Sequence, residues 1–193
     1  VWSLTEGRRA TVENAKKAAD MGVDMIVLTG NPGVGVDNRA ITKALADLNE
    51  AVGDRVILTA GKMHASGILS EAGEKILTKE DAETFIEAGA DVLLLPAPGT
   101  VPGFTMEHAA ELIKTAHEKG VLAMTTIGTS QEGADEETIR QIALMCKMAG
   151  ADIHHIGDSG YMGMALPENI TAYSVAIRGK RHTYRRMAMS LVR

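Results

Sequence analysis

One recurring phrase constrains the fold of this 193-residue chain more than any other feature. A helical stretch ends at a glycine, a polar residue usually follows, and an apolar run then stops at glycine or proline. The repeated glycines lie about 30 residues apart, at Gly22, Gly53, Gly89, Gly120 and Gly150. A strand, a helix and two loops need about that length, so the repeat predicts consecutive βα units with parallel strands.

The segments between the glycines carry their own signals. Apolar runs predict strands at residues 25–30, 56–61, 92–96, 121–128 and 153–157, nearly continuous as in parallel sheets covered on both faces. Thr78 and Asp81 have the spacing of a capping box, Thr105 is a typical N-cap residue, and Pro167 suits a first helical turn. The repeated glycines are expected to end the helices in the left-handed conformation.

Two α/β folds fit these units: a parallel (β/α)8 TIM-type barrel and a five-stranded flavodoxin-like open sheet. A whole barrel typically needs about 250 residues, more than this chain has. The opening residues, Val1-Trp2-Ser3, resemble the tail of a strand. We therefore expect the C-terminal five or so βα units of a barrel. On this interpretation residues 1–193 form a single α/β barrel domain lacking its N-terminal units, with a basic C-terminal helix at residues 178–193.

Composition excludes several classes of function. No run of about 18 apolar residues predicts a membrane span, and the first residues do not have the pattern of a signal peptide. Cys146 is the only cysteine, which excludes a zinc site built on cysteines. It lies on an expected buried helix face. A formal charge of −5 and only six aromatic residues provide no footprint for nucleic acid. We expect a cytoplasmic protein with neither a membrane nor a nucleic-acid partner.

Basic residues gather near the C-terminus, in residues 178–193. This cluster predicts a solvated or subunit-contact helix in a homo-oligomer. A site for a phosphate or an acidic partner is the alternative.

In parallel βα folds the chemistry collects at the carboxyl ends of the strands. Asp24, Asp91 and Asp152 begin strands at the opposite end, so we interpret their recurrence as structural. Lys62 follows the second expected strand, where a lysine can form a Schiff base, bind a phosphate or stabilise an enolate. His64, two residues further on, can transfer protons. The alternative is a surface lysine and a loop histidine that pairs with backbone.

The loops after the last two strands predict a phosphate site. Barrels frequently bind a phosphate there, and glycine lets the backbone approach an anion closely while hydroxyls add donors. Ordinary turn chemistry is the alternative. The expected phosphate-binding residues are Gly128, Thr129, Ser130, Gly157, Ser159 and Gly160.

Asp158 lies in the same loop, where it can act as a general base, bind a hydroxyl or hold a metal. His154 and His155 precede it on the last strand, and strand alternation sends one side chain into the barrel and the other toward the helices. A hydrogen-bonded core histidine is the alternative reading for both. Our candidate catalytic set is Lys62, His64, His155 and Asp158.

Four segments, residues 60–64, 154–161, 167–170 and 176–186, resemble an uncharacterised bacterial family. Its members are predicted to form phosphate-binding TIM barrels and have been labelled haloacid-dehalogenase-like hydrolase or phosphoenolpyruvate phosphonomutase-like protein. The resemblance implies the barrel and supplies no catalytic residues. The Asp-x-Asp nucleophile of haloacid dehalogenases is absent from residues 1–193, and no acidic cluster for magnesium stands out at the strand ends. Neither label therefore predicts a reaction.

The leading functional hypothesis is an enzyme that acts on a small phosphorylated metabolite by lyase, aldolase-like or isomerase chemistry. A metal-assisted hydrolase that uses Asp158 is one alternative, and a non-catalytic barrel that binds a phosphorylated effector is another. We predict no cofactor and no metal-ligating set, although a divalent metal such as Mg²⁺ would suit the hydrolase alternative. The sequence does not specify the substrate.

Overall fold

The computed structural model describes residues 5–30, 35–64, 70, 72–157 and 165–189. Helices and strands alternate along these residues in the order expected of βα units. In chain order the elements are η1 (Glu6–Arg8), α1 (Val12–Asp20), β1 (Met25–Thr29), α2 (Asn38–Val52), β2 (Ile57–Gly61), η4 (Gly73–Ile76), α3 (Lys79–Glu87), β3 (Val92–Pro96), α4 (Met106–Glu118), β4 (Leu122–Ile127), η5 (Gln131–Gly133), α5 (Glu136–Ala149), β5 (Ile153–Ile156) and α6 (Pro167–Ala188).

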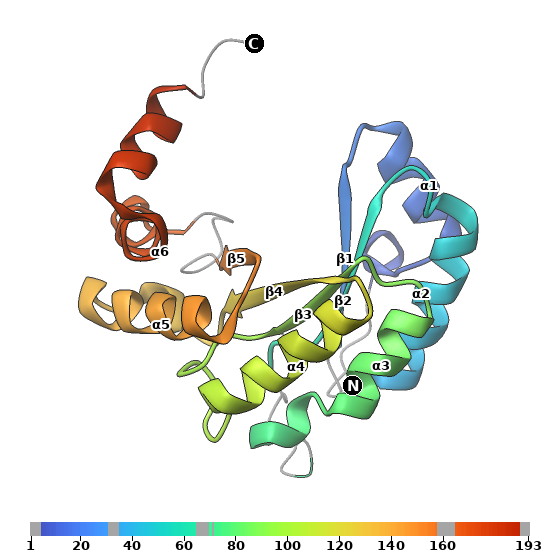
Figure 1. Ribbon diagram of the computed structural model, residues 1–193. Helices are drawn as coiled ribbons and strands as arrows, with labels where there is room; N and C mark the ends of the chain where they lie inside the picture. Colours follow the sequence, from blue (N-terminus) through green and yellow to red (C-terminus); the bar gives the residue numbers. More distant parts are fainter. Residues whose placement is uncertain (1–4, 31–34, 65–69, 71, 158–164, 190–193) are drawn as a thin grey trace.

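The five strands form one parallel sheet in the order β1-β2-β3-β4-β5. Figure 1 shows that the sheet curls into a half-barrel whose helices lie along its outer, convex side. A flavodoxin-like sheet would place the second strand before the first and put helices on both faces. That alternative is therefore wrong, and the arrangement is the one expected of part of a barrel.

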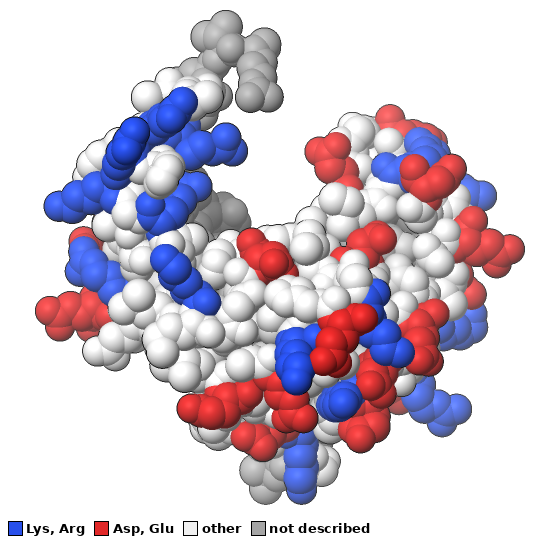
Figure 2. All heavy atoms as spheres, viewed as in Figure 1, with Lys and Arg blue, Asp and Glu red and all other residues white. Residues whose placement is uncertain are grey.

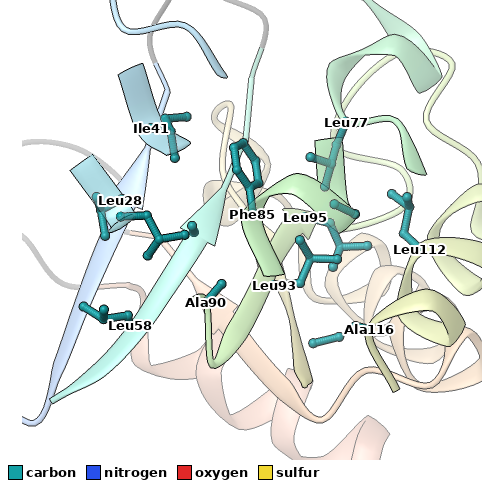
Figure 3. Close-up of a cluster of buried hydrophobic side chains, with 14 of the residues drawn as sticks. Leu28, Ile41, Leu58, Leu77, Phe85, Ala90, Leu93, Leu95, Leu112 and Ala116 are labelled. Atoms are coloured by element: carbon teal, nitrogen blue, oxygen red, sulfur yellow. The ribbon is translucent and has the colours of Figure 1, made fainter. Parts of the chain in front are cut away.

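The main hydrophobic core lies between the convex face of the sheet and the helices. Alternation within the strands sends Leu28, Leu58 and Leu93 to this face, where they pack with residues such as Phe85 and Leu112 of the helices. Figure 3 shows these side chains between strands and helices. Each of the five is at most 5% exposed, so this layer supplies most of the apolar burial that stabilises the fold.

The concave face of the sheet carries a second, smaller apolar cluster. Val92, Leu94 and Met124 are buried there, and Met25 and Ile153 pack on them from the two outer strands. Three other strand residues on this face, Val27, Ile57 and Leu122, remain 46%, 43% and 49% exposed. The concave face is thus apolar but incompletely covered within the described residues.

Two of the repeated aspartates form hydrogen bonds to neighbouring strands, and we call these contacts the aspartate clasps. The carboxylate of Asp91, at the start of β3, accepts a 2.8 Å hydrogen bond from the backbone N–H of Leu58 in β2. Asp152, before β5, accepts one of the same length from Ala123 in β4. Each carboxylate satisfies a strand N–H one unit back in the chain, which confirms the structural role predicted for these two residues.

The predicted helix signals are confirmed at most positions. Thr78 and Asp81 form the expected capping box, Thr105 caps α4, and Pro167 lies in the first turn of α6. Four of the five repeated glycines have positive φ, between 77° and 106°. Gly53 differs: it ends α2 with φ −63°, because its N–H continues the helical pattern by bonding to Asn49.

The last helix consists of two segments, and the second carries most of the basic residues of the expected C-terminal helix. α6 begins at Pro167 and continues into the basic region, but its path is broken at Gly179, which has φ 76° and ψ 161°. The residues before Gly179 pack against α5, where Cys146 is fully buried as predicted. None of the described helices is long and apolar enough to cross a membrane.

Candidate functional site

Lys62 directly follows β2, at the carboxyl edge of the sheet, and is only 1% exposed. Its aliphatic stem lies beside Gly30, at the end of the neighbouring strand β1. A Cβ atom on Gly30 would lie 3.4 Å from Lys62 Cε and 3.0 Å from Ile41 Cδ1 of α2. Lys62 is therefore held between the ends of two strands and the first turn of α2, and the surface-lysine alternative is wrong.

The residues after Lys62 lead the chain over the concave face. Met63 packs against the concave cluster at Val92, Leu94 and Met124, and the half-buried His64 follows it. This turn keeps His64 at the carboxyl edge, on the same loop as Lys62.

The two strand histidines lie on opposite faces of β5. His154 points toward α6, where its Nδ1 lies 2.9 Å from the hydroxyl of Tyr173. His155 pairs in register with Thr126 and shares its concave side of the sheet. His155 is exposed there, yet partial burial of its ring lowers its pKa, which favours the neutral imidazole near pH 7.

His154 has the features of a structural histidine. Burial lowers its pKa, and the negative charge of Asp152 offsets this effect only in part. With Tyr173 it lines a cavity of about 360 Å³ between β5 and α6, at the open edge of the sheet. Its hydrogen bond to Tyr173 fits the alternative of a satisfied core histidine.

Lys62 and His155 lie on strands separated by β3 and β4. At about 4.8 Å per strand, three spacings along the sheet correspond to roughly 14 Å. The two residues share an edge but are not immediate neighbours. Asp158, the expected third member of this cluster, lies outside the described residues, as do Ser159 and Gly160.

The loop after β4 contains two consecutive residues in the left-handed region. Thr129 has φ 59° and Ser130 has φ 70°, the only described non-glycine residues with positive φ. The Thr129 hydroxyl donates to the carbonyl of Thr100, 2.6 Å away in the loop after β3. Such strain costs of order 1–3 kcal/mol per residue and concentrates at functional sites.

Asn169 of α6 forms hydrogen bonds to the loop after β4. This side chain is 2% exposed, and its amide donates to the carbonyls of Glu132 and Ala134, each at 2.9 Å. Two donors from one buried amide fix the turn that follows Thr129 and Ser130. These hydrogen bonds hold the loop after β4 in a defined conformation.

Gly157 brings the end of β5 against the same loop. Its N–H donates to the Ile127 carbonyl at 2.9 Å, so this donor already has a partner. A Cβ at Gly157 would lie only 3.1 Å from that carbonyl oxygen and 3.9 Å from Cγ of Glu132. Gly128, Thr129, Ser130 and Gly157 thus meet on neighbouring strands, as the phosphate hypothesis requires.

Glu132 is a candidate that the sequence reasoning missed. It lies in η5 beside Gly157, and its Oε2 is buried without a hydrogen-bond partner among the described residues. An unpaired buried acceptor costs about 1–3 kcal/mol, so a donor or cation at this position would be stabilising. An acidic residue two positions after Ser130 was the available signal.

Thr59 and Thr126 add polar groups to the concave face. Thr126 donates to the Leu95 carbonyl at 3.0 Å, whereas the buried Thr59 hydroxyl has no partner within the described ranges. Thr59 lies two residues before Gly61 in β2, on the same face of the strand. Sequence reasoning overlooked both because they lie inside apolar runs.

A further cavity lies at the opposite end of the strands from these candidates. It measures about 530 Å³ and is lined by strand-start residues, including Asp24, Ile57, Asp91, Leu122 and Ile153. Because this is the end where the aspartate clasps lie, we interpret it as the uncovered interior of the half-barrel. Among the described residues, no three His, Cys, Asp or Glu side chains converge as a metal site would require.

A family model covers residues 1–193, and the chain belongs to this family, which is described as "Domain of unknown function (DUF7916)". No curated protein matches the chain. The chain is similar in fold to several solved barrel structures, and all the identities are at or below 20%. The comparison therefore establishes the fold and not the activity.

Three of these structures illustrate the similarity. A provisionally assigned lyase/mutase from Burkholderia cenocepacia J2315 has a TM-score of 0.64 and 16% identity, over 89% of this chain and 63% of that one. Deoxyribose phosphate aldolase from Aeropyrum pernix, described as a tetramer, gives 0.62 and 20%, over 91% and 70%. An archaeal fructose-1,6-bisphosphate aldolase, with its catalytic Lys covalently bound to a carbinolamine intermediate, gives 0.59 and 18%, over 88% and 61%.

The chain thus spans about two thirds or less of the length of two of these structures. Similar folds include a provisionally assigned phosphonomutase, which agrees with one of the labels carried by the resembled family. None of the similar structures named above is described as a haloacid dehalogenase. The fold is that of part of a parallel βα barrel.

Proposed function

We propose that this protein is a lyase of the aldolase type that acts on a small phosphorylated metabolite at the carboxyl edge of its strands. The observation that carries the proposal is Lys62, an amine 1% exposed at the end of β2. A lysine side chain is rarely buried without a functional or structural partner. The names of the similar lyase and aldolase structures support the same class of reaction. An isomerase that uses the same edge is the nearest alternative.

In this proposal Lys62 stabilises the negative charge that develops on the substrate oxygen when a carbon–carbon bond breaks. His155, neutral near pH 7, and Asp158 move the protons, with His64 as the further proton-transferring candidate. The alternative role is an imine: the amine of Lys62 adds to a substrate carbonyl and water leaves, as the carbinolamine in the archaeal aldolase suggests. We favour the stabilising role because no other Lys or Arg lies within five residues of Lys62 in the sequence.

The phosphate of the substrate is assigned to the loops after β4 and β5. Gly128, Thr129 and Ser130 supply backbone donors from the strained turn, and Ser159 and Gly160 supply them from the other loop. Gly157 contributes close approach rather than its N–H, because that group donates to Ile127. The strain at Thr129 and Ser130 supports the assignment.

Glu132 favours the metal-assisted hydrolase as a second candidate. Its buried, unpartnered Oε2 fits a divalent cation such as Mg²⁺, which prefers carboxylate oxygens, with Asp158 as the second ligand. In the aldolase proposal the same oxygen binds a substrate hydroxyl instead. The non-catalytic barrel requires only the phosphate loops.

We further propose that the described half-barrel is the C-terminal part of an eight-stranded barrel and that the protein forms a homo-oligomer. The sequential strand order and the 61–74% coverage of similar structures support barrel completion. The tetrameric description of the Aeropyrum aldolase is compatible with self-association.

The test begins with a thermal-shift screen of small carbonyl phosphates against the full-length protein. Compounds that bind are then incubated with borohydride, and the protein is mapped by mass spectrometry. Lys62→Met, which keeps the stem and removes the charge, should abolish binding or turnover, whereas Lys79→Met on the surface of α3 should not. Mg²⁺ titration of the same samples tests the hydrolase.

The outcomes separate the roles of Lys62. Turnover without a trapped adduct supports the stabilising role, and a reduced adduct on Lys62 supports the imine. Turnover that is unchanged in Lys62→Met would contradict both. Hydrolysis that requires Mg²⁺ and is lost in Glu132→Gln would replace the aldolase proposal.

A further inference from the structure

The end of α6 forms a surface unlike the rest of the molecule. We define the basic arm as residues 180–189, the helical segment that follows the break at Gly179. Residues 1–177 hold all 25 Asp and Glu but 14 of the 20 Lys and Arg, a formal charge of −11. Residues 178–193 hold the other six Lys and Arg and no acid. Figure 2 shows blue atoms without red ones over this arm.

The basic arm has little packing of its own. Nine of its ten residues are exposed, and Thr183 is the exception. Tyr184 and Met189 are 55% and 54% exposed, so apolar side chains lie among the arginines. A helix shorter than about 12–15 residues is marginal in water when nothing packs against it. The arm therefore has the character of a segment that is stabilised by a partner.

Two like charges on the arm destabilise the helix that carries them. Arg181 and Arg185 are spaced i,i+4, and like charges at this spacing destabilise a helix. Elsewhere the i,i+4 ion pairs join opposite charges, in α1, α2, α4 and α5. Within the described residues neither Arg181 nor Arg185 forms an ion pair.

The segment that contains α3 and α4 is acidic, which complements the charge of the arm. Residues 72–118 contain nine Asp and Glu against three Lys. On α4, Glu107 and Glu111 are both exposed, are spaced i,i+4, and make no ion pair with any described residue. This acidic pair has the spacing of Arg181 and Arg185 with the opposite sign.

The two pairs belong to separate parts of one molecule. α6 packs mainly on α5, and Figure 1 shows the arm projecting away from the body while α4 lies on the outer side of the half-barrel. One copy therefore cannot bring its own arm against its own α4 without leaving this arrangement.

We propose that the basic arm of one copy docks against α4 of a second copy, with Arg181 and Arg185 facing Glu107 and Glu111. The docking places opposite charges across two helices that each carry an unfavourable like-charge pair. Tyr184 and Met189 provide the apolar contact that a stable helix–helix interface needs. The body charge of −11 disfavours polyanions such as nucleic acid or anionic lipid as the partner. This interface would carry the self-association proposed above and does not depend on the reaction.

Charge-swap variants of the full-length protein test the contact by sedimentation equilibrium. Arg181→Glu with Arg185→Glu should weaken self-association by about tenfold to a hundredfold, and Glu107→Lys with Glu111→Lys should do the same. All four changes in one chain should restore association, because each arm again meets an opposite charge. The control, Lys16→Glu with Arg39→Glu, makes the same charge change as the arm variant at two exposed basic residues, on α1 and α2 rather than on α4 or the arm. Circular dichroism checks that each variant is folded.

Several results would overturn the proposal. These are a wild-type protein that stays monomeric at low ionic strength, an arm variant no weaker than the control, or a four-residue variant that fails to recover. Binding of the arm to anionic vesicles or RNA in place of self-association would do so as well. None of these measurements uses enzymatic activity, so the aldolase proposal stands or falls separately.

Discussion

His154 shows how one residue of a histidine pair acquires a structural role. Its ring is held between the sheet and the hydroxyl of Tyr173, whereas His155 faces the concave side. Because burial disfavours a charged ring, the folded protein resists protonating His154 at a pH where the unfolded chain accepts a proton readily.

This difference makes stability depend on pH. Above the ordinary pKa of 6.5 the ring of His154 is neutral in both states and its contribution is constant. As the pH falls below that value, the unfolded state binds more protons, so the free energy of unfolding decreases until the lowered folded pKa is reached. We expect His154→Gln to flatten the fall in urea stability between about pH 7 and about pH 5. An unchanged slope would mean that other groups produce it.

Ser130 offers a test of strain in the candidate phosphate loop. Its φ of 70° suits glycine, and no cap hydrogen bond from its side chain is formed. We expect Ser130→Gly to raise the free energy of unfolding by up to about 1 kcal/mol, because relief of the strain exceeds the added chain entropy. Gln131→Gly, in the following turn, should destabilise instead. Loss of stability in Ser130→Gly would show that the loop is not strained at this residue.

The elements could be predicted from the sequence more reliably than the site. Strand alternation, capping residues and repeated glycines are local signals, and they located all five strands to within about a residue or two. Glu132 was missed because its importance arises from the approach of Gly157, 25 positions later in the chain. Left-handed Thr129 and Ser130 were also unpredictable, since local propensity favours glycine or asparagine there.

Lys62 was found from the sequence, but its surroundings were not. Its position after a strand indicated the carboxyl edge, whereas its burial depends on Gly30 and Ile41, which come from another unit. Contacts between units depend on how the sheet curls, and apolar patterns do not specify this curvature. The same limit applies to the 14 Å separation between Lys62 and His155 estimated above from strand spacing.

At the scale of elements, Asn169 joins α6 to the loop after β4. Asn169→Ala removes two hydrogen bonds and leaves the carbonyls of Glu132 and Ala134 without that donor. We expect a loss of about 1–3 kcal/mol in urea denaturation, together with faster amide exchange in residues 128–134. The control is Thr171→Ala, an exposed residue in the same turn. Equal effects from the two variants would argue against a tie specific to Asn169.

At the scale of the whole molecule, the exposed concave face distinguishes a half-barrel from a closed barrel. Leu122 is 49% exposed here, but a closed barrel would bury it among interior side chains. In the full-length protein we expect Leu122→Asp to cost about 3 kcal/mol or more, because it buries an unpaired charge. Met21→Asp, at a residue 85% exposed, should cost little. A small effect at Leu122 would mean that the barrel does not close over it.

The aspartate clasps have a consequence for how the chain is made. Asp91 bonds to Leu58 and Asp152 bonds to Ala123, so in both cases the later unit completes the earlier one. On the ribosome the N–H groups of β2 and β4 emerge before the carboxylates that satisfy them. During translation β2 and β4 therefore lack these hydrogen bonds until the aspartate before the next strand has left the exit tunnel. Each of these two strands can form its clasp only after the following unit has begun to emerge.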